Sequence, residues 1–247
     1  MADLSFYVGV IGNVISVLMF LSPVSTFIRI VKHRSTEDFD SLPYVSTLLN
    51  SSLWTYYGLI NDELLVSTVN GFGVLVEIVY VALFLAFAPR RMKVKTGILV
   101  GTLDIGFFVA AILVTRLALQ GNLRIGALGM ICAGLNIVMY GSPLAAMKTV
   151  VTTKSVEYMP FLLSFFLFLN GGIWAFYAVL RRDIYLLIPN GTGCMLGVAQ
   201  LVLYALYMNA KPTKTDQLSE KLMEEGSQAP EVITSSKRED AKSWWKF

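Results

Sequence analysis

Two stretches of the sequence follow one pattern: Trp54-Thr-Tyr-Tyr57 with Asn70-Gly-Phe-Gly73, and Trp174-Ala-Phe-Tyr177 with Asn190-Gly-Thr-Gly193. Each reads W-x-x-Y, then twelve residues, then N-G-x-G, and the two copies lie 120 positions apart. The same offset aligns Gly9 with Gly129, Met19 with Met139, Ser22 with Ser142, Pro23 with Pro143, Ser35 with Ser155 and Asn50 with Asn170. Because an average residue type matches by chance about one time in fifteen, these agreements indicate a duplicated unit.

The composition is that of a membrane protein. Of 247 residues, 55% are hydrophobic and 15% are charged, whereas soluble domains carry about 25% charged residues. The net charge of +3 is too small to predict a nucleic-acid partner. Cys132 and Cys194 lie in apolar segments, which argues against a disulfide framework. Residues 1–6 lack the basic region and cleavage site of a signal peptide, so we expect the first apolar segment to be retained.

The apolar runs predict seven transmembrane helices, because each can cross about 30 Å of hydrocarbon as a helix. They cover residues 6–30, 43–60, 64–88, 97–118, 125–147, 160–180 and 184–208. The offset pairs the first three spans with the last three, and the unpaired fourth span restores the direction of the second copy. We therefore predict an all-α multi-pass membrane protein with a 3+1+3 architecture. Its parallel repeats are residues 1–88 and 125–208, and residues 89–124 form a linker helix with its loops.

The distribution of basic residues predicts the orientation. The loops after the first, third and fifth spans, together with residues 209–247, hold 16 of the 20 Lys and Arg residues. Cytosolic loops carry such an excess, so we expect the N-terminus on the non-cytosolic side and the C-terminus in the cytosol. Residues 209–247 are rich in Lys, Glu, Ser, Thr and Pro, a composition typical of disorder. They are expected to form a disordered cytosolic tail.

Six residues that match at the offset place amides and indoles inside apolar helices. They are Asn50, Trp54, Asn70, Asn170, Trp174 and Asn190. Residues four apart share a helix face, so the first Asn and the Trp of each repeat point the same way, and a two-fold arrangement gathers all six around one cavity. Amides both donate and accept hydrogen bonds, and indole faces pack on apolar C–H groups, so the cavity would suit a ligand that is both polar and apolar. The alternative is that these residues, like the glycines of N-G-x-G, only hold helices together.

Four prolines are expected at similar depth near the cytosolic side. Pro23 and Pro143 lie inside apolar runs, toward the ends of spans one and five, whereas Pro43 and Pro160 open spans two and six. Proline removes a backbone donor and clashes with the preceding turn. We therefore predict that all four kink or break their helices and serve as a hinge or gate. The alternative for Pro43 and Pro160 is a favourable position in the first helical turn.

Ten segments carry a family resemblance. They are Gly12-Asn13, Leu21-Ser-Pro23, Arg34-Ser-Thr36, Leu42-Pro-Tyr44, Trp54-Thr-Tyr-Tyr57-Gly58, Val66-Ser-Thr-Val-Asn-Gly71, Tyr140-Gly-Ser-Pro143, Thr153-Lys-Ser155, Met159-Pro160 and Ile188-Pro-Asn-Gly191. On these motifs the chain resembles the plant SWEET sugar transporters over residues 5–210. Two further stretches, residues 51–57 and 148–154, make it most similar to the vacuolar-membrane branch of that family.

The resemblance implies passive, bidirectional sugar transport by alternating access in a lipid bilayer, and the trimer that the family forms. It implies the vacuolar membrane as location, with the plasma membrane as the alternative. Family substrate contacts fall on Trp54, Trp174, Asn70 and Asn190. An extrafacial gate is implied at Tyr57 and Asp183, where a phenol can donate to a carboxylate across the cavity. For Asp183, which follows two arginines, a solvated surface loop is the alternative.

The resemblance also bears on substrate size. Met19, Asn50, Met139 and Asn170 lie one turn before a central aromatic residue or proline. In SWEET carriers that move sucrose, the matching positions hold smaller side chains such as Val and Ser. The larger residues of this chain predict a narrower cavity, in which a second sugar ring costs a few kcal/mol of strain. We expect a monosaccharide, fructose or glucose; only the similarity to the vacuolar branch favours fructose.

Other classes of protein fit the sequence less well. A seven-helix receptor shares the orientation but has no three-helix duplication. A proton-coupled PQ-loop amino-acid transporter carries Pro-Gln in spans one and five, where this chain has Pro-Val and Pro-Leu. No constellation indicates an enzyme, a metal site or a cofactor. Glu77 and Asp104 are acids deep in spans three and four and are functional candidates by default, but we assign neither a coupling role.

Overall fold

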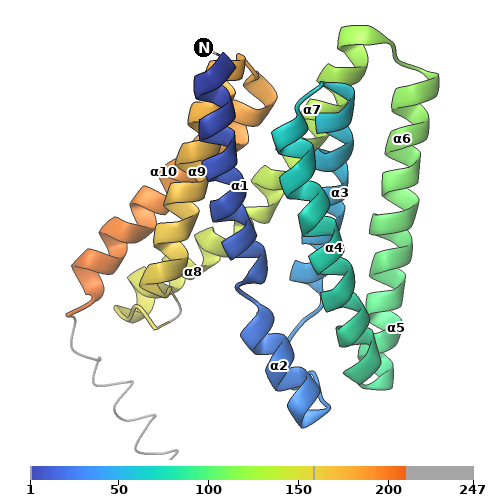
Figure 1. Ribbon diagram of the computed structural model, residues 1–247. Helices are drawn as coiled ribbons and strands as arrows, with labels where there is room; N and C mark the ends of the chain where they lie inside the picture. The colour runs from blue at the N-terminus through green and yellow to red at the C-terminus, as the bar shows by residue number, and fades with distance from the viewer. Residues whose placement is uncertain (1, 158, 210–247) are drawn as a thin grey trace, which may run out of the picture.

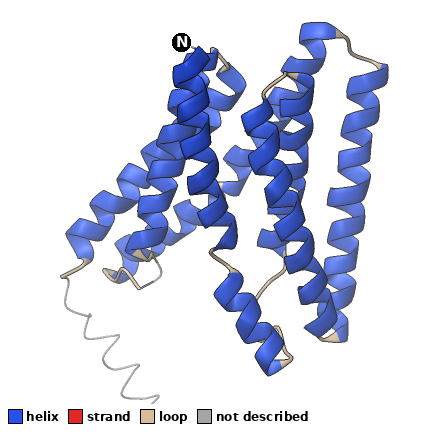
Figure 2. Cartoon of the chain, viewed as in Figure 1, coloured by secondary structure: helices blue, strands red, loops and turns tan. Residues whose placement is uncertain are grey.

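The computed structural model describes residues 2–157 and 159–209, and this part of the chain is helical without any strand (Figure 2). The helices are α1 (Ala2–Leu21), α2 (Val24–His33), α3 (Leu42–Ile60), α4 (Leu64–Phe87), α5 (Arg90–Leu99), η1 (Val100–Phe107), α6 (Phe108–Leu117), α7 (Gly121–Met139), α8 (Gly141–Thr153), α9 (Phe161–Arg181) and α10 (Ile184–Tyr207). The segment η1 is a π-helical stretch that continues α5 into α6. Apart from Asn209, the predicted tail lies outside the described residues.

The helices form seven rods that follow the seven predicted spans. The first rod is α1 with α2, the fourth is α5 through α6, and the fifth is α7 with α8. By length and composition, six rods among the described residues are apolar enough to cross a membrane. The rod that falls short is α3, because Ser, Thr and Asn residues interrupt its apolar sequence. This helix carries Asn50 and Trp54, so its polarity belongs to the predicted cavity.

The helix contacts are those of two parallel repeats, as predicted. In the first repeat α4 packs against α1 and α3, and in the second α10 packs against α7 and α9. Between the repeats, α1 packs against α9 and α3 packs against α7. The first helix of each repeat thus contacts the second helix of the other, and α1 and α7 run in the same direction (Figure 1). The linker rod lies beside α3, outside the two repeats (Figure 1).

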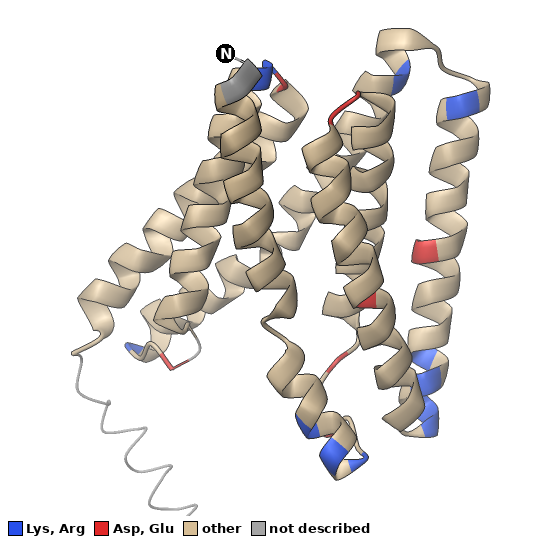
Figure 3. Cartoon of the chain, in the orientation of Figure 1, with Lys and Arg blue, Asp and Glu red and all other residues tan. Residues whose placement is uncertain are grey.

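Lys and Arg residues gather at one end of the bundle (Figure 3). This end, which we call the basic end, is formed by α2, by the start of α5 and by the connection between α8 and α9. We call the opposite end, where α1 begins, the N-terminal end. Among the described residues, only four basic side chains lie at the N-terminal end, namely Arg116, Arg124, Arg181 and Arg182. The uneven distribution agrees with the count made from the sequence.

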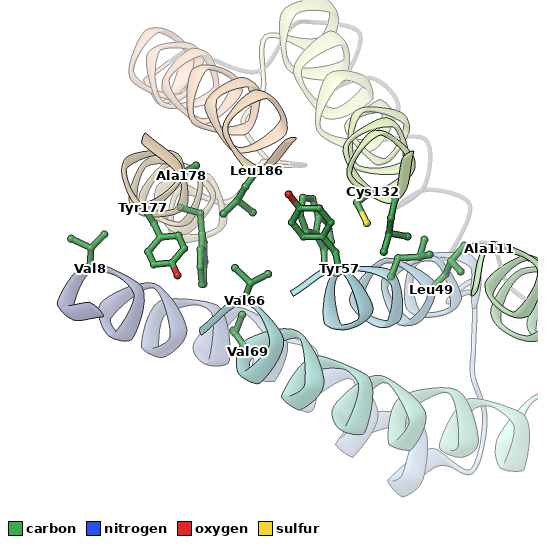
Figure 4. Close-up of a cluster of buried hydrophobic side chains, with 14 residues drawn as sticks. Val8, Leu49, Tyr57, Val66, Val69, Ala111, Cys132, Tyr177, Ala178 and Leu186 are labelled. Carbon is green, nitrogen blue, oxygen red and sulfur yellow. The ribbon is translucent and has the colours of Figure 1, made fainter. Parts of the chain in front are cut away.

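The largest buried apolar cluster joins the repeats toward the N-terminal end. It includes Trp54 and Tyr57 from the first repeat and Trp174, Tyr177 and Leu186 from the second. Figure 4 labels Tyr57, Tyr177 and Leu186. Two smaller clusters toward the basic end contain residues of the first repeat and the start of the linker rod. The two halves approach each other at the N-terminal end and diverge toward the basic end (Figure 1). Apolar packing therefore holds the repeats together at one end.

Two of the four predicted proline breaks are present. The chain leaves α1 after Leu21 and re-enters a helix after Pro23, and α7 ends four residues before Pro143. Because proline has no N–H, Pro23 cannot donate to the carbonyl of Met19, and Pro143 cannot donate to that of Met139. The expectation was wrong for the other two: Pro43 lies in the first turn of α3 and Pro160 immediately precedes α9. There a missing N–H disturbs no helical hydrogen bond.

Candidate functional site: a polar cavity between the repeats

A cavity of about 580 Å³ lies between the two repeats. Its walls come from α1, α3 and α4 on one side and from α7 to α10 on the other. The lining includes the exposed residues Pro43, Ser142 and Leu163, so the cavity opens toward the basic end. Pockets of roughly 300–1,000 Å³ accommodate small molecules. The volume therefore suits a ligand of that class.

All eight predicted substrate contacts line this cavity. They are Met19, Asn50, Trp54, Asn70, Met139, Asn170, Trp174 and Asn190. Of the predicted gate residues, Pro23, Pro43 and Pro143 also line it, whereas Pro160 does not. Asp104 lies outside the lining, as expected from its place in the unpaired span. The structure thus brings the matched residues of both repeats to one space.

The asparagines of the two N-G-x-G motifs are held by their own helices. The Nδ2 atom of Asn70 donates to the carbonyl oxygen of Val66 at 2.9 Å, and that of Asn190 donates to the carbonyl oxygen of Leu186 at 2.8 Å. An amide has two N–H groups and an oxygen acceptor. Each side chain therefore keeps one donor and its acceptor for a ligand while its orientation is fixed.

The glycines of these motifs serve packing at one position in each repeat. A Cβ atom on Gly73 would overlap the ring of Phe20, and one on Gly193 would overlap the hydroxyl of Tyr140. Phe20 and Tyr140 are themselves 120 positions apart, so the two contacts are equivalent. The Tyr140 hydroxyl also donates to the carbonyl oxygen of Pro189, inside α10, at 2.5 Å. These close approaches fix α4 against α1 and α10 against α7.

The two repeats differ in how their indole and first amide are paired. In the second repeat, Trp174 Nε1 donates to Ser16 Oγ at 2.9 Å, and Ser16 Oγ donates to Asn170 Oδ1 at 2.6 Å. In the first repeat, Trp54 Nε1 and Asn50 Oδ1 are buried without a hydrogen-bond partner among the described residues. Buried polar groups are normally paired. The first repeat therefore leaves a donor and an acceptor, one helical turn apart, for a polar ligand.

The predicted pair of Tyr57 and Asp183 is formed at the N-terminal end. The Tyr57 hydroxyl donates to Asp183 Oδ2 at 2.8 Å, and Asn61 Nδ2 approaches the same two oxygens at 3.3 and 3.4 Å. Asp183 Oδ1 accepts from the backbone N–H of Leu186 and so caps α10. Because Asp183 is only 8% exposed, the alternative of a solvated surface loop is wrong. We call these contacts the first latch.

A second latch, which the matches between identical residues do not reveal, mirrors the first. The Tyr177 hydroxyl donates to Glu63 Oε2 at 2.6 Å, and Arg181 Nε donates to Glu63 Oε1 at 2.7 Å. Tyr177 and Glu63 are the residues 120 positions from Tyr57 and Asp183. The offset could have identified this pair, but Glu63 and Asp183 differ in residue type and were not matched. Each repeat thus donates a tyrosine hydroxyl to a carboxylate of the other.

Each latch tyrosine contacts the indole of its own repeat. The rings of Trp54 and Tyr57 are 5.2 Å apart and meet edge to face, and those of Trp174 and Tyr177 are 5.4 Å apart in the same arrangement. The indoles line the cavity, whereas the tyrosines close it toward the N-terminal end. Each indole therefore contacts both the cavity and the latch tyrosine of its own repeat.

Two parallel three-helix repeats that enclose a polar cavity, open at one end and latched at the other, define a membrane carrier. Comparison with known proteins agrees. The model of the family described as "Sugar efflux transporter for intercellular exchange" matches twice, at residues 6–92 and 126–212. The bidirectional sugar transporter SWEET17 of Arabidopsis thaliana is 61% identical over 95% of this chain and 97% of its own length. SWEET16 of the same plant is 60% identical over 88% of this chain and 95% of its own length.

A solved structure of a eukaryotic SWEET transporter superimposes with a TM-score of 0.79 at 39% identity, covering 83% of this chain and 96% of that one. The chain therefore belongs to the SWEET family of sugar transporters, as its motifs indicated, and is a transporter rather than an enzyme.

Proposed function

We propose that the protein is a bidirectional, energy-independent uniporter that moves monosaccharides across a membrane by alternating access. The observation that carries this proposal is the cavity between the repeats, whose polar lining comes from symmetry-related positions. A cavity on the axis between two similar halves can open to either side by a similar movement of each half. Relatives that are named bidirectional sugar transporters support the proposal.

The cavity offers the contacts that a hexose needs. The unpaired Trp54 N–H and Asn50 oxygen can exchange hydrogen bonds with adjacent sugar hydroxyls. Asn70 and Asn190 add a donor and an acceptor each from the facing helices. The two indole rings can cover the apolar C–H faces of the ring. A sugar bound in this way satisfies the buried polar groups that the protein leaves unpaired.

The size of the lining side chains favours one sugar ring over two. Met19, Asn50, Met139 and Asn170 all contribute to the cavity wall. A disaccharide has to displace these side chains, at a strain of a few kcal/mol, and each 1.4 kcal/mol lowers affinity about tenfold. We therefore propose fructose and glucose as substrates, with sucrose transported poorly. Fructose is favoured on the similarity to the vacuolar branch alone.

The location and assembly are proposals of the same kind. We place the protein in the vacuolar membrane, with the plasma membrane as the alternative. The chain resembles the vacuolar-membrane branch of the family and is 61% and 60% identical to SWEET17 and SWEET16. The basic end of the bundle faces the cytosol by the distribution of Lys and Arg residues (Figure 3). The N-terminus is then non-cytosolic, and the cavity opens to the cytosol. We further propose the trimeric assembly of the family.

Uptake into proteoliposomes tests this function. Labelled fructose and glucose should equilibrate across the membrane at a rate that does not depend on a pH gradient, and labelled sucrose should enter much more slowly. Flux that follows the pH gradient contradicts the uniporter proposal, and efficient sucrose uptake contradicts the size argument. The variant that combines Met19→Val, Asn50→Ser, Met139→Val and Asn170→Ser should gain sucrose uptake, because its cavity is wider at the four lining positions.

A further inference from the structure

Glu77 is a buried carboxyl in the cavity wall that the proposed sugar site does not use. It lies on α4, lines the cavity and is 3% exposed. Its Oε2 atom has no hydrogen-bond partner in the described part of the chain. Tyr44 and Tyr80 lie near the carboxyl, but neither hydroxyl pairs with its Oε2 atom. The Tyr80 hydroxyl instead donates to the carbonyl oxygen of Phe20 at 3.0 Å. Leaving a polar group buried and unpaired costs free energy. We therefore expect a ligand to pair with the carboxyl of Glu77.

The position of Glu77 separates it from the central site. It follows Asn70 by seven residues on α4, which places it on the same helix face about 10.5 Å nearer the basic end. A single hexose in contact with Asn70 does not span two helical turns. Other polar residues of the lining near the basic end are Tyr44 and Thr47 in the first repeat and Ser164 and Gln200 in the second. The cavity therefore has two polar levels.

We propose that Glu77, with the ring of Tyr44, forms a second sugar-binding station between the central site and the basic end. This inference rests on the proposed function and adds a second binding site to the path of the sugar through the protein. An ionised carboxyl accepts hydrogen bonds at both oxygens, and a protonated one accepts at its carbonyl oxygen and donates from its O–H, so either form can bind two neighbouring hydroxyls. A tyrosine ring packs on apolar C–H groups. The station therefore suits a polyol with adjacent hydroxyls, the chemistry that hexoses share.

The carboxyl of the station has no counterpart in the second repeat. The offset of 120 positions pairs Glu77 with Gly197, which has no side chain to bind a hydroxyl. A sugar entering from the basic end meets Glu77 before the central asparagines, whereas a sugar entering from the N-terminal end meets it last. The two-fold symmetry of the repeats is thus broken along the path. The consequence is that apparent affinity differs between the two faces, and Glu77 sets the difference.

Fluxes measured separately from each face test the station. Proteoliposomes of known orientation, with sugar on one side only, give a half-saturation concentration of fructose for each face. Glu77→Met removes the carboxyl at similar volume, and we expect it to raise half-saturation at the basic face roughly three- to tenfold, the range of one lost hydrogen bond. Because a passive carrier obeys detailed balance, the maximal rate from that face should rise by the same factor. Half-saturation at the N-terminal face should not change.

Two further variants make the result decisive. Glu77→Gln keeps one acceptor oxygen and should give an intermediate shift; it decides the question alone if Glu77→Met does not fold. Asp38→Asn removes an exposed acid at the basic end outside the cavity and should leave both faces unchanged. An equal shift at both faces, or none at either, overturns the station. Absence of fructose and glucose flux in the unmodified protein instead overturns the proposed function.

Discussion

Trp54 and Trp174 occupy equivalent positions but differ in hydrogen bonding. Ser16, on α1, accepts from the indole of Trp174 and donates to Asn170, whereas the position paired with Ser16 in the second repeat is Asn136. The longer Asn136 side chain lines the cavity but makes no hydrogen bond with Trp54 or Asn50 in the described structure. Hydrogen bonds thus hold the indole and the amide of one half of the proposed site, and we expect a bound sugar to pair those of the other half.

Asn190 offers a direct test of the central site. In the described part of the chain, its side-chain amide donates only to the carbonyl of Leu186 in its own helix. We therefore expect Asn190→Ala to remove ligand contacts without breaking hydrogen bonds between helices. Loss of hydrogen bonds to sugar hydroxyls costs roughly 1–3 kcal/mol, so we expect fructose flux to fall by about fivefold or more. Tracer uptake into proteoliposomes measures the fall, and thermal unfolding checks that the protein remains folded.

Asn122→Ala is the matched control for Asn190→Ala. Asn122 is an exposed asparagine at the start of α7, outside the cavity, and its loss should leave flux unchanged. Retained transport by Asn190→Ala with an unaltered half-saturation concentration removes Asn190 from the site. The equivalent change at Asn70 should behave as Asn190→Ala does, since both amides have the same hydrogen bond to their own helix.

At this scale the sequence predicted the residues that match in type and missed those that match only in chemistry. The paired amides, indoles and methionines were found because one offset aligns identical residues. Glu63 was not predicted, because its counterpart is Asp183, a shorter acid. Each of the two carboxylates accepts a hydrogen bond from a tyrosine hydroxyl. The hydrogen bond from Trp174 to Ser16 could not be predicted, because it joins two repeats whose approach depends on packing rather than on local sequence.

The broken rods show what local sequence determines for single elements. Apolar runs placed all seven rods, since span length and hydropathy are local properties. Proline chemistry placed the breaks in the first and fifth rods, because there an N–H is missing inside a helix. It did not do so for Pro43 and Pro160, where the helix begins at the proline. The π-helical stretch η1 carries no such signal.

The two breaks lead to a prediction about movement. Pro23→Ala or Pro143→Ala supplies the N–H that can bind the carbonyl of Met19 or Met139 and so straightens a rod that now turns beside the cavity. We expect the maximal flux to fall several-fold, because closing the basic end needs this bend, while sugar binding is largely preserved. Counterflow measures the maximal rate, and inhibition by unlabelled fructose measures binding.

Pro89→Ala is the control for the proline series, since Pro89 precedes α5 and does not line the cavity. Its flux should equal that of the unmodified protein. Normal flux in all four single changes at Pro23, Pro43, Pro143 and Pro160 contradicts a hinge or gate role for these residues. A loss of sugar binding as large as the loss of flux also contradicts the hinge role. A hinge changes the rate of transport and leaves the contacts to the sugar intact.

For the whole molecule, the repeat offset and the odd number of helices per repeat were enough to predict the architecture. Two parallel repeats need an added crossing, and that requirement depends on chain direction alone. The conformation was beyond prediction, because the alternating access that we propose requires at least two arrangements of the same sequence. The described arrangement is joined at the N-terminal end by apolar packing and both latches, and its cavity opens at the basic end.

The latches lead to a prediction about the population of the alternative arrangement. Tyr57→Phe and Tyr177→Phe each remove one hydroxyl that donates to a buried carboxylate of the other repeat. A hydrogen bond to a charged group contributes about 1.5–3 kcal/mol, so each change should shift the equilibrium away from the latched arrangement. Because the two bonds lie in different contacts, the double variant should shift it by more than either single change.

Spin labels can report this shift between equivalent positions of the two repeats. Leu64 begins α4 and Ile184 begins α10; both are exposed at the N-terminal end and lie 120 positions apart. With Cys132 and Cys194 replaced by Ala, labels at Leu64→Cys and Ile184→Cys should show a longer-distance population that grows from the unmodified protein to each single variant and again to the double variant. Tyr7→Phe, at an exposed tyrosine of the same end, should show no growth. A double variant that matches either single variant contradicts two independent latches, and one that matches the unmodified protein shows that apolar packing alone holds this end closed.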